Sequence, residues 1–76
     1  MLINVTQTDI NKGTPGIACS CPIAQAIKRE QNAYTVAVWM REIKIDGRRW
    51  HTTKVMAKFI TDFDNGKIVK PHCFKI

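Results

Sequence analysis

The fold is decided by residues 43–51, which have the sequence Ile43-Lys44-Ile45-Asp46-Gly47-Arg48-Arg49-Trp50-His51. Apolar and charged residues alternate before the turn, as in a strand with one buried face, and Asp46-Gly47 is typical of a two-residue hairpin turn. A turn of this length pairs Ile45 with Arg48. One step further from the turn, Lys44 lies opposite Arg49. The sequence therefore predicts an antiparallel hairpin with one apolar face and one charged face.

Residues 34–40, before the hairpin, are rich in β-branched and aromatic side chains and predict a further strand. Its apolar residues Val36 and Val38 fall at even positions, whereas those of the hairpin fall at odd positions. Because a continuous strand would expose one of the two sets, we expect a bulge or a short loop near Arg41-Glu42.

Two helices flank this β region. The first is predicted over residues 21–31, where Ser20 can cap the helix and Asn32 can end it in the left-handed conformation. The second begins after Thr52 or Thr53 and ends at Asn65-Gly66. Its apolar residues have helical spacing and predict a core-facing stripe of Val55, Met56, Phe59, Ile60 and Phe63.

The two ends of the chain complete the pattern. Residues 3–6 predict a short strand, followed by a helical turn over residues 9–12 that Thr8 caps and Gly13 ends in the left-handed conformation. Residues 68–76 predict an extended segment that Pro71 interrupts, which suits an edge strand. If residues 34–45 are counted as one strand with a break, the order is β-α-β-β-α-β, which predicts one α+β domain over residues 1–76, with an antiparallel or mixed sheet and two helices packed on one face.

The composition is that of a folded protein, with 45% hydrophobic and 24% charged residues among 76. No stretch is apolar enough to span a membrane and the first residues do not resemble a signal sequence, so we expect no membrane association. The three cysteines include Cys19 and Cys21, which are too close in sequence for an unstrained disulfide. Reduced thiols, and with them a cytoplasmic location, are therefore expected.

Charge is the strongest compositional signal. Twelve Lys and Arg against six Asp and Glu give a formal net charge of +6. Such a charge attracts phosphate backbones, anionic membranes and acidic protein surfaces alike. It also serves solubility alone, so the sign of the charge does not by itself select a partner.

Two metal sites can be considered. Cys19, Cys21, His72 and Cys73 are four soft ligands in two pairs, the number that a structural zinc site needs. Their spacing is awkward, since adjacent residues of a strand point to opposite faces, and the cysteines can equally be small buried hydrophobes. The acidic stretch Asp62–Gly66 lacks the positions of a calcium-binding loop, so it is better explained as the end of a helix. We therefore expect no metal and no cofactor.

Nucleophilic catalysis would need a thiolate paired with His51 or His72. Cys21 at the start of a helix would have a lowered pKa, which favours such a role. The chain contains no nucleophile elbow, no phosphate-binding glycine loop and no zinc-protease helix. We therefore expect a protein that is not an enzyme.

The basic and aromatic residues around the hairpin are the best candidate contact surface. Lys44 opposite Arg49 places two like charges on one face, which is unfavourable unless an anionic partner covers them. Arginine and tryptophan also dominate protein–protein hot spots and single-strand stacking surfaces. The alternative is that Trp50 packs on the core and the charges are simply solvated. The predicted contact residues are Arg41, Lys44, Arg48, Arg49, Trp50 and Lys54.

The chain resembles a group of small uncharacterised proteins encoded by phages and bacterial prophages. The shared pattern consists of residues 3–10 (INVTQTDI), Gly13, residues 21–27 (CPIAQAI), residues 45–47 (IDG), residues 59–66 (FITDFDNG) and residues 69–71 (VKP). The resemblance carries no catalytic residues. It implies a virus-encoded accessory protein in the bacterial cytoplasm, whose usual role is to block a host defence complex or redirect a host enzyme.

These observations together predict a protein that binds and inhibits or modulates a bacterial protein complex, in the manner of an anti-CRISPR or another anti-defence inhibitor. Direct nucleic-acid binding by the same hairpin is the alternative, and a zinc-stabilised interaction module is a more distant one. The sequence leaves the identity of the partner and the oligomeric state open.

Overall fold

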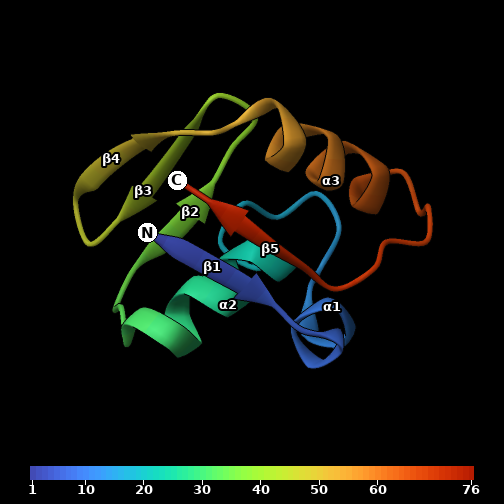
Figure 1. The fold of residues 1–76 in the computed structure, drawn as a ribbon, viewed down its shortest axis with the longest axis horizontal. Helices are drawn as coiled ribbons and strands as arrows, with labels where there is room; N and C mark the ends of the chain where they lie inside the picture. The colour runs from blue at the N-terminus through green and yellow to red at the C-terminus, as the bar shows by residue number, and fades with distance from the viewer.

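Three helices and five strands make up the computed structural model, which describes residues 1–76 (Figure 1). In chain order they are β1 (Leu2–Val5), α1 (Gln7–Lys12), α2 (Pro22–Gln31), β2 (Val36–Val38), β3 (Glu42–Ile45), β4 (Arg48–His51), α3 (Lys54–Asp64) and β5 (His72–Lys75). The α+β class is confirmed. The expected helical turn near the N-terminus is a third helix, α1.

The strands form two antiparallel sheets instead of the single sheet that we expected. One consists of β1 and β5, with Ile3 opposite Phe74, and the other has the order β2-β3-β4. The outer edge of β1 is occupied by α2: the Asn4 N–H donates to Glu30 at 2.7 Å, and Arg29 donates to the Asn4 carbonyl at 2.9 Å. Since these main-chain groups are already used, no strand of the second sheet can pair with β1 there.

The predicted hairpin is confirmed in its register. Ile45 pairs with Arg48 and Lys44 with Arg49, across a turn in which Asp46 (φ 48°) and Gly47 (φ 87°) both have positive φ. This is the backbone that a two-residue hairpin turn requires, and glycine adopts it without strain. Asp46 has a second role, because its carboxylate accepts hydrogen bonds from the Tyr34 and Thr35 N–H groups at 2.9 and 2.8 Å.

The change of apolar parity near Arg41-Glu42 comes from a second hairpin, so the predicted break is a loop rather than a bulge. Val38 pairs with Ile43, and the Trp39 N–H donates to the Glu42 carbonyl at 2.8 Å. Because the chain reverses here, both apolar sets point to the same face of the sheet.

The helix starts differ from our predictions by one or two residues. Thr6, not Thr8, caps α1 in a reciprocal capping box with Asp9, and Cys21, not Ser20, caps α2. Gly13 is not left-handed (φ −67°); a glycine is needed there because a Cβ atom would lie 2.8 Å from the Pro22 ring. Thr53 caps α3, as one of the two predicted alternatives.

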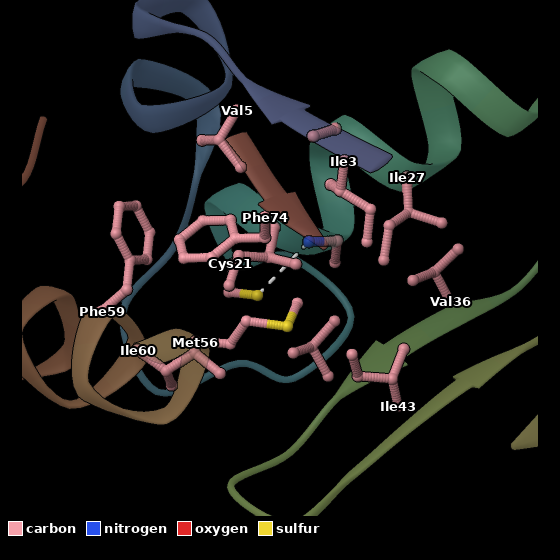
Figure 2. Close-up of a cluster of buried hydrophobic side chains, with 14 of the residues drawn as sticks. Ile3, Val5, Cys21, Ile27, Val36, Ile43, Met56, Phe59, Ile60 and Phe74 are labelled. Carbon is pink, nitrogen blue, oxygen red and sulfur yellow. Dashed lines mark hydrogen bonds between the residues drawn. The ribbon is translucent and has the colours of Figure 1, made fainter. Parts of the chain in front are cut away.

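The core lies between the two sheets, α2 and α3, and Figure 2 shows side chains from all of these elements pointing toward one another. Phe59 of α3 and Phe74 of β5 pack edge to face, with ring centroids 5.2 Å apart. The predicted stripe of α3 is confirmed for Met56, Phe59 and Ile60, whereas Val55 is 60% exposed. Val55 lies at the margin of the stripe, one residue before its buried start.

One buried ion pair joins α1 to α2. Arg29 Nη2 lies 2.8 Å from Asp9 Oδ2, and Asp9 is 3% exposed. Burial by itself would raise the pKa of Asp9, but hydrogen bonds from Arg29 and Thr6 outweigh it, so the pKa lies below the ordinary value. Asp9 therefore stabilises the fold as a carboxylate, while Arg29 keeps contact with solvent.

We predict that Asp9→Asn lowers the free energy of unfolding by about 2 kcal/mol at neutral pH, because it weakens both the ion pair and the capping box. Because the pKa of Asp9 is lower in the folded than in the unfolded chain, its carboxylate contributes stability in full above the unfolded pKa of about 3.9. This stability is lost as the pH falls through the pKa of Asp9 in the folded protein. The difference between wild type and variant should therefore narrow in acid, as measured by chemical denaturation at several pH values.

Asp62→Asn is the matched control, because Asp62 forms ion pairs with Lys58 and Lys67 on the surface. Asp62→Asn should lower the free energy of unfolding by less than about 0.5 kcal/mol. Equal losses for the two variants would show that burial of the Asp9 pair has no particular weight.

Candidate functional site

The predicted contact residues of the hairpin divide between its two faces. Lys44 and Arg49 are opposite each other on the face that points away from the core. Arg48 and Trp50 pair with the buried Ile45 and Ile43, and their side chains therefore lie on the core side of the sheet. The residues do not form one flat patch. They surround β4 from both sides.

Arg49 has an internal counter-charge that the sequence analysis did not identify. Its Nε lies 3.1 Å from Glu42 Oε1 on the neighbouring strand, and the two side chains are 70% and 41% exposed. This pair relieves part of the repulsion between Arg49 and Lys44, so the like charges need no external anion to coexist. Lys44 itself has no carboxylate partner.

A surface hollow of about 520 Å³ lies beside β4, lined by Arg41, Glu42, Arg49, Trp50 and His51. Three of these residues, Arg41, Arg49 and Trp50, were predicted contact residues. Glu42 and His51 were missed, although the hairpin register places them opposite each other and could have identified them. Arginine and histidine side chains at one hollow can hold a carboxylate or a phosphate, and here the Arg49 guanidinium is already paired with Glu42.

The other predicted contact residues differ in their position relative to this hollow. Trp50 is partly buried and packs against the core, as the structural alternative proposed, yet it lines the hollow as well. Arg48 and Trp50 also line a second hollow of about 360 Å³, next to Met1 and Gln31. Lys54 begins α3 and lines neither hollow.

The distribution of ion pairs explains where the excess positive charge lies. All six side-chain carboxylates are engaged: Asp9, Glu42 and Asp62 in ion pairs, and Glu30, Asp46 and Asp64 as acceptors of main-chain N–H groups. Eight of the twelve cations have no carboxylate partner. Half of these eight belong to the predicted contact set, namely Arg41, Lys44, Arg48 and Lys54.

A second exposed surface, also missed by the sequence analysis, is apolar. Ile17, Trp39 and Met40 are 47%, 45% and 49% exposed and line one hollow of about 130 Å³. Trp39 and Met40 form the loop between β2 and β3, and Ile17 comes from the loop before α2. The three meet only because β2 lies against that loop, where the Val38 N–H donates to the Ala18 carbonyl at 2.9 Å.

The zinc candidates do not come together. Nowhere in residues 1–76 do three His, Cys, Asp or Glu side chains form a group that could hold a metal ion. Cys21 is buried, while Cys19, His72 and Cys73 are exposed. The carboxylates of the rejected calcium loop have other partners, because Asp64 accepts a hydrogen bond from the Gly16 N–H at 2.9 Å and Asp62 binds lysines.

The expected lowered pKa of Cys21 is wrong. Cys21 is 2% exposed, and burial raises the pKa of its thiol. Its Sγ accepts a hydrogen bond from the Ala24 N–H at 3.4 Å, the contact marked in Figure 2, but this interaction does not offset the burial. No hydrogen bond joins any cysteine to His51 or His72, so the structure assembles no thiol–imidazole pair.

No helix of the structure has the length and apolar character needed to cross a membrane. Comparison of the chain with protein-family models, with curated proteins and with solved structures finds no match in any of the three. The function must therefore be inferred from the site itself.

We predict that a thiol reagent modifies Cys19 and Cys73 rapidly in the native protein and Cys21 only when the protein unfolds, because Cys21 is buried and its thiolate is disfavoured. Mass spectrometry of the protein after timed alkylation, with and without denaturant, measures the three rates. Rapid native modification of Cys21 would contradict the buried position and restore Cys21 as a candidate nucleophile.

Proposed function

We propose that this protein acts by binding an acidic surface of a partner protein through its hairpin, without a catalytic step. The observation that carries the proposal is the surplus of cations: the fold uses every side-chain carboxylate internally and leaves Arg41, Lys44 and Arg48 without partners around β4. Cations of this kind accelerate encounter with an acidic surface and select against basic ones.

The resemblance to phage-encoded proteins suggests the biological setting. In that setting the protein is an accessory factor in the bacterial cytoplasm that inhibits or modulates a host protein complex, as anti-CRISPR and other anti-defence inhibitors do. A binding role suits the hairpin, since its side chains can bind a carboxylate and no thiol is hydrogen-bonded to a histidine that could activate it.

We predict that Arg41→Glu combined with Lys44→Glu lowers partner capture at least about tenfold, because both cations face the partner without an internal counter-charge. The Arg49–Glu42 pair stays intact in this variant, and the glutamate introduced in β3 would lie opposite Arg49, so the fold should keep its stability. The tagged protein is used to capture proteins from nuclease-treated bacterial lysate, and the stoichiometric band is quantified.

The matched control is Lys12→Glu combined with Lys70→Glu, which removes the same amount of positive charge from α1 and from the segment between α3 and β5, both on the opposite side of the molecule from the hairpin (Figure 1). Capture should persist in the control. If the partner band survives in Arg41→Glu with Lys44→Glu, the interface lies elsewhere on the protein. If the band is lost equally in the control, capture depends only on the net charge of the protein.

Direct nucleic-acid binding is the second candidate, favoured by one observation. The hollow beside β4 is lined by Trp50 as well as by Arg41 and Arg49, and bases stack on aromatic rings while guanidinium groups bind phosphates.

If nucleic acid is the partner, we predict that the affinity for a single-stranded oligonucleotide falls steeply between about 50 and 200 mM salt, because each phosphate contact releases counterions. Fluorescence anisotropy of a labelled oligonucleotide measures the slope. Weak binding with a flat salt response would exclude this candidate, as would a captured protein band that does not change on nuclease treatment.

A further inference from the structure

The strand β4 forms an open edge of its sheet. It pairs only with β3, and Figure 1 shows it on the outer side of the three-stranded sheet, away from β2. A strand in this position leaves main-chain N–H and C=O groups without partners along one side, which is where an additional strand can bind.

The residues that carry these free groups follow from the register. The Thr52 N–H donates to the Arg41 carbonyl at 3.1 Å, and hydrogen-bonded pairs of an antiparallel ladder recur at every second residue. Trp50 and Arg48 therefore bond to β3, and the main-chain groups of Arg49 and His51 point away from the sheet. On β3 the opposite set bonds to β2, as the contact between the Trp39 N–H and the Glu42 carbonyl shows.

The fold covers two comparable edges with its own groups. Along β1, Arg29 and Glu30 bind both main-chain groups of Asn4. Along β2, the Val38 N–H is bound by the Ala18 carbonyl. The edge of β5 is open as well, but β5 carries a single lysine, Lys75, whereas β4 carries two adjacent arginines and borders the hollow with Arg41.

Charge selects the occupant of the β4 edge. A second copy of this chain would place two β4 strands, each with two arginines, side by side, and in the register centred on Arg49 the two Arg49 side chains would face each other, which destabilises a strand pair. An acidic strand would instead meet His51 and Arg49 on the outer face, where Arg49 binds Glu42 through its Nε and its side chain remains 70% exposed. On the other face it would meet Arg48 and the apolar indole of Trp50.

We propose that an extended acidic segment of a partner protein adds to β4 as a fourth strand, with alternating acidic and apolar residues that face Arg49 and Trp50 respectively. This inference rests on the proposed function, in which the hairpin binds an acidic protein surface, and it specifies the binding mode, namely addition of a strand to β4. Main-chain hydrogen bonds to Arg49 and His51 fix the segment, and the side chains of β4 select its sequence.

The first test uses the wild-type chain and an acetylated, amidated peptide of four Glu-Val repeats. Amide hydrogen exchange followed by NMR should show rapid exchange of the Arg49 and His51 amides in the free protein and at least roughly tenfold slower exchange with the peptide bound. A peptide of four glutamates followed by four valines has the same composition without the alternation and should bind more weakly. Equal binding of both peptides, no binding of either, or protection of the Cys73 and Lys75 amides instead would overturn the proposal.

The second test removes one main-chain donor. His51→Pro deletes the outward N–H without touching the bonds to β3, whereas His51→Ala removes the side chain and keeps the N–H. Peptide affinity should be roughly tenfold lower in His51→Pro than in His51→Ala, since both variants lack the imidazole and only His51→Pro lacks the N–H, with thermal melting as the check that both variants fold.

The two proposals fail differently. If His51→Pro binds the peptide as well as His51→Ala while Arg41→Glu with Lys44→Glu still loses the partner, strand addition is wrong and the charged surface stands. If Arg41→Glu with Lys44→Glu keeps its lysate partner, the proposed function itself is wrong.

Discussion

The ion pair between the buried Asp9 and the half-exposed Arg29 joins the first three elements of the structure. Asp9 completes the capping box of α1, and Arg29 connects it to α2 and to the carbonyl of Asn4 in β1. With Glu30 on the Asn4 N–H, this arrangement closes the edge of β1. The hairpin strands then build a sheet of their own, which ends at β4. The fold thus closes the edge of β1 with its own side chains and leaves the edge of β4 open.

The acidic side chains of this protein make contacts within the fold, whereas most basic side chains lie at the surface without a carboxylate partner. Asp46 and Asp64 accept hydrogen bonds from the main chain of distant segments, at Thr35 and Gly16, so these carboxylates join parts of the chain that the sequence separates. None is left over to neutralise Arg41 or Lys44. The net charge of +6 comes from the composition, and the structure determines its distribution: the carboxylates are engaged within the fold, and cations without carboxylate partners remain at the surface.

The residues on which the resemblance to phage proteins rests are also structural. Asp9 and Gly13 fix the start of the chain, Cys21 caps α2, and Asp46-Gly47 forms the hairpin turn. None of the six predicted contact residues belongs to the quoted pattern. The pattern is thus informative about how the chain folds, whereas the proposed binding depends on residues of β3 and β4 outside it.

The local structure was predictable from the sequence alone. The register of the hairpin, the extent of α2, the end of α3 and the break near Arg41-Glu42 follow from apolar periodicity and turn chemistry, which act over a few residues. Long-range contacts, in contrast, set the division of the strands into two sheets, the choice of Thr6 and Cys21 as caps, the burial of Cys21 and the pairing of Glu42 with Arg49. These features depend on which residues, distant in sequence, contact a given strand edge or side chain in the folded chain. That competition among segments far apart in the chain is not encoded in any short stretch.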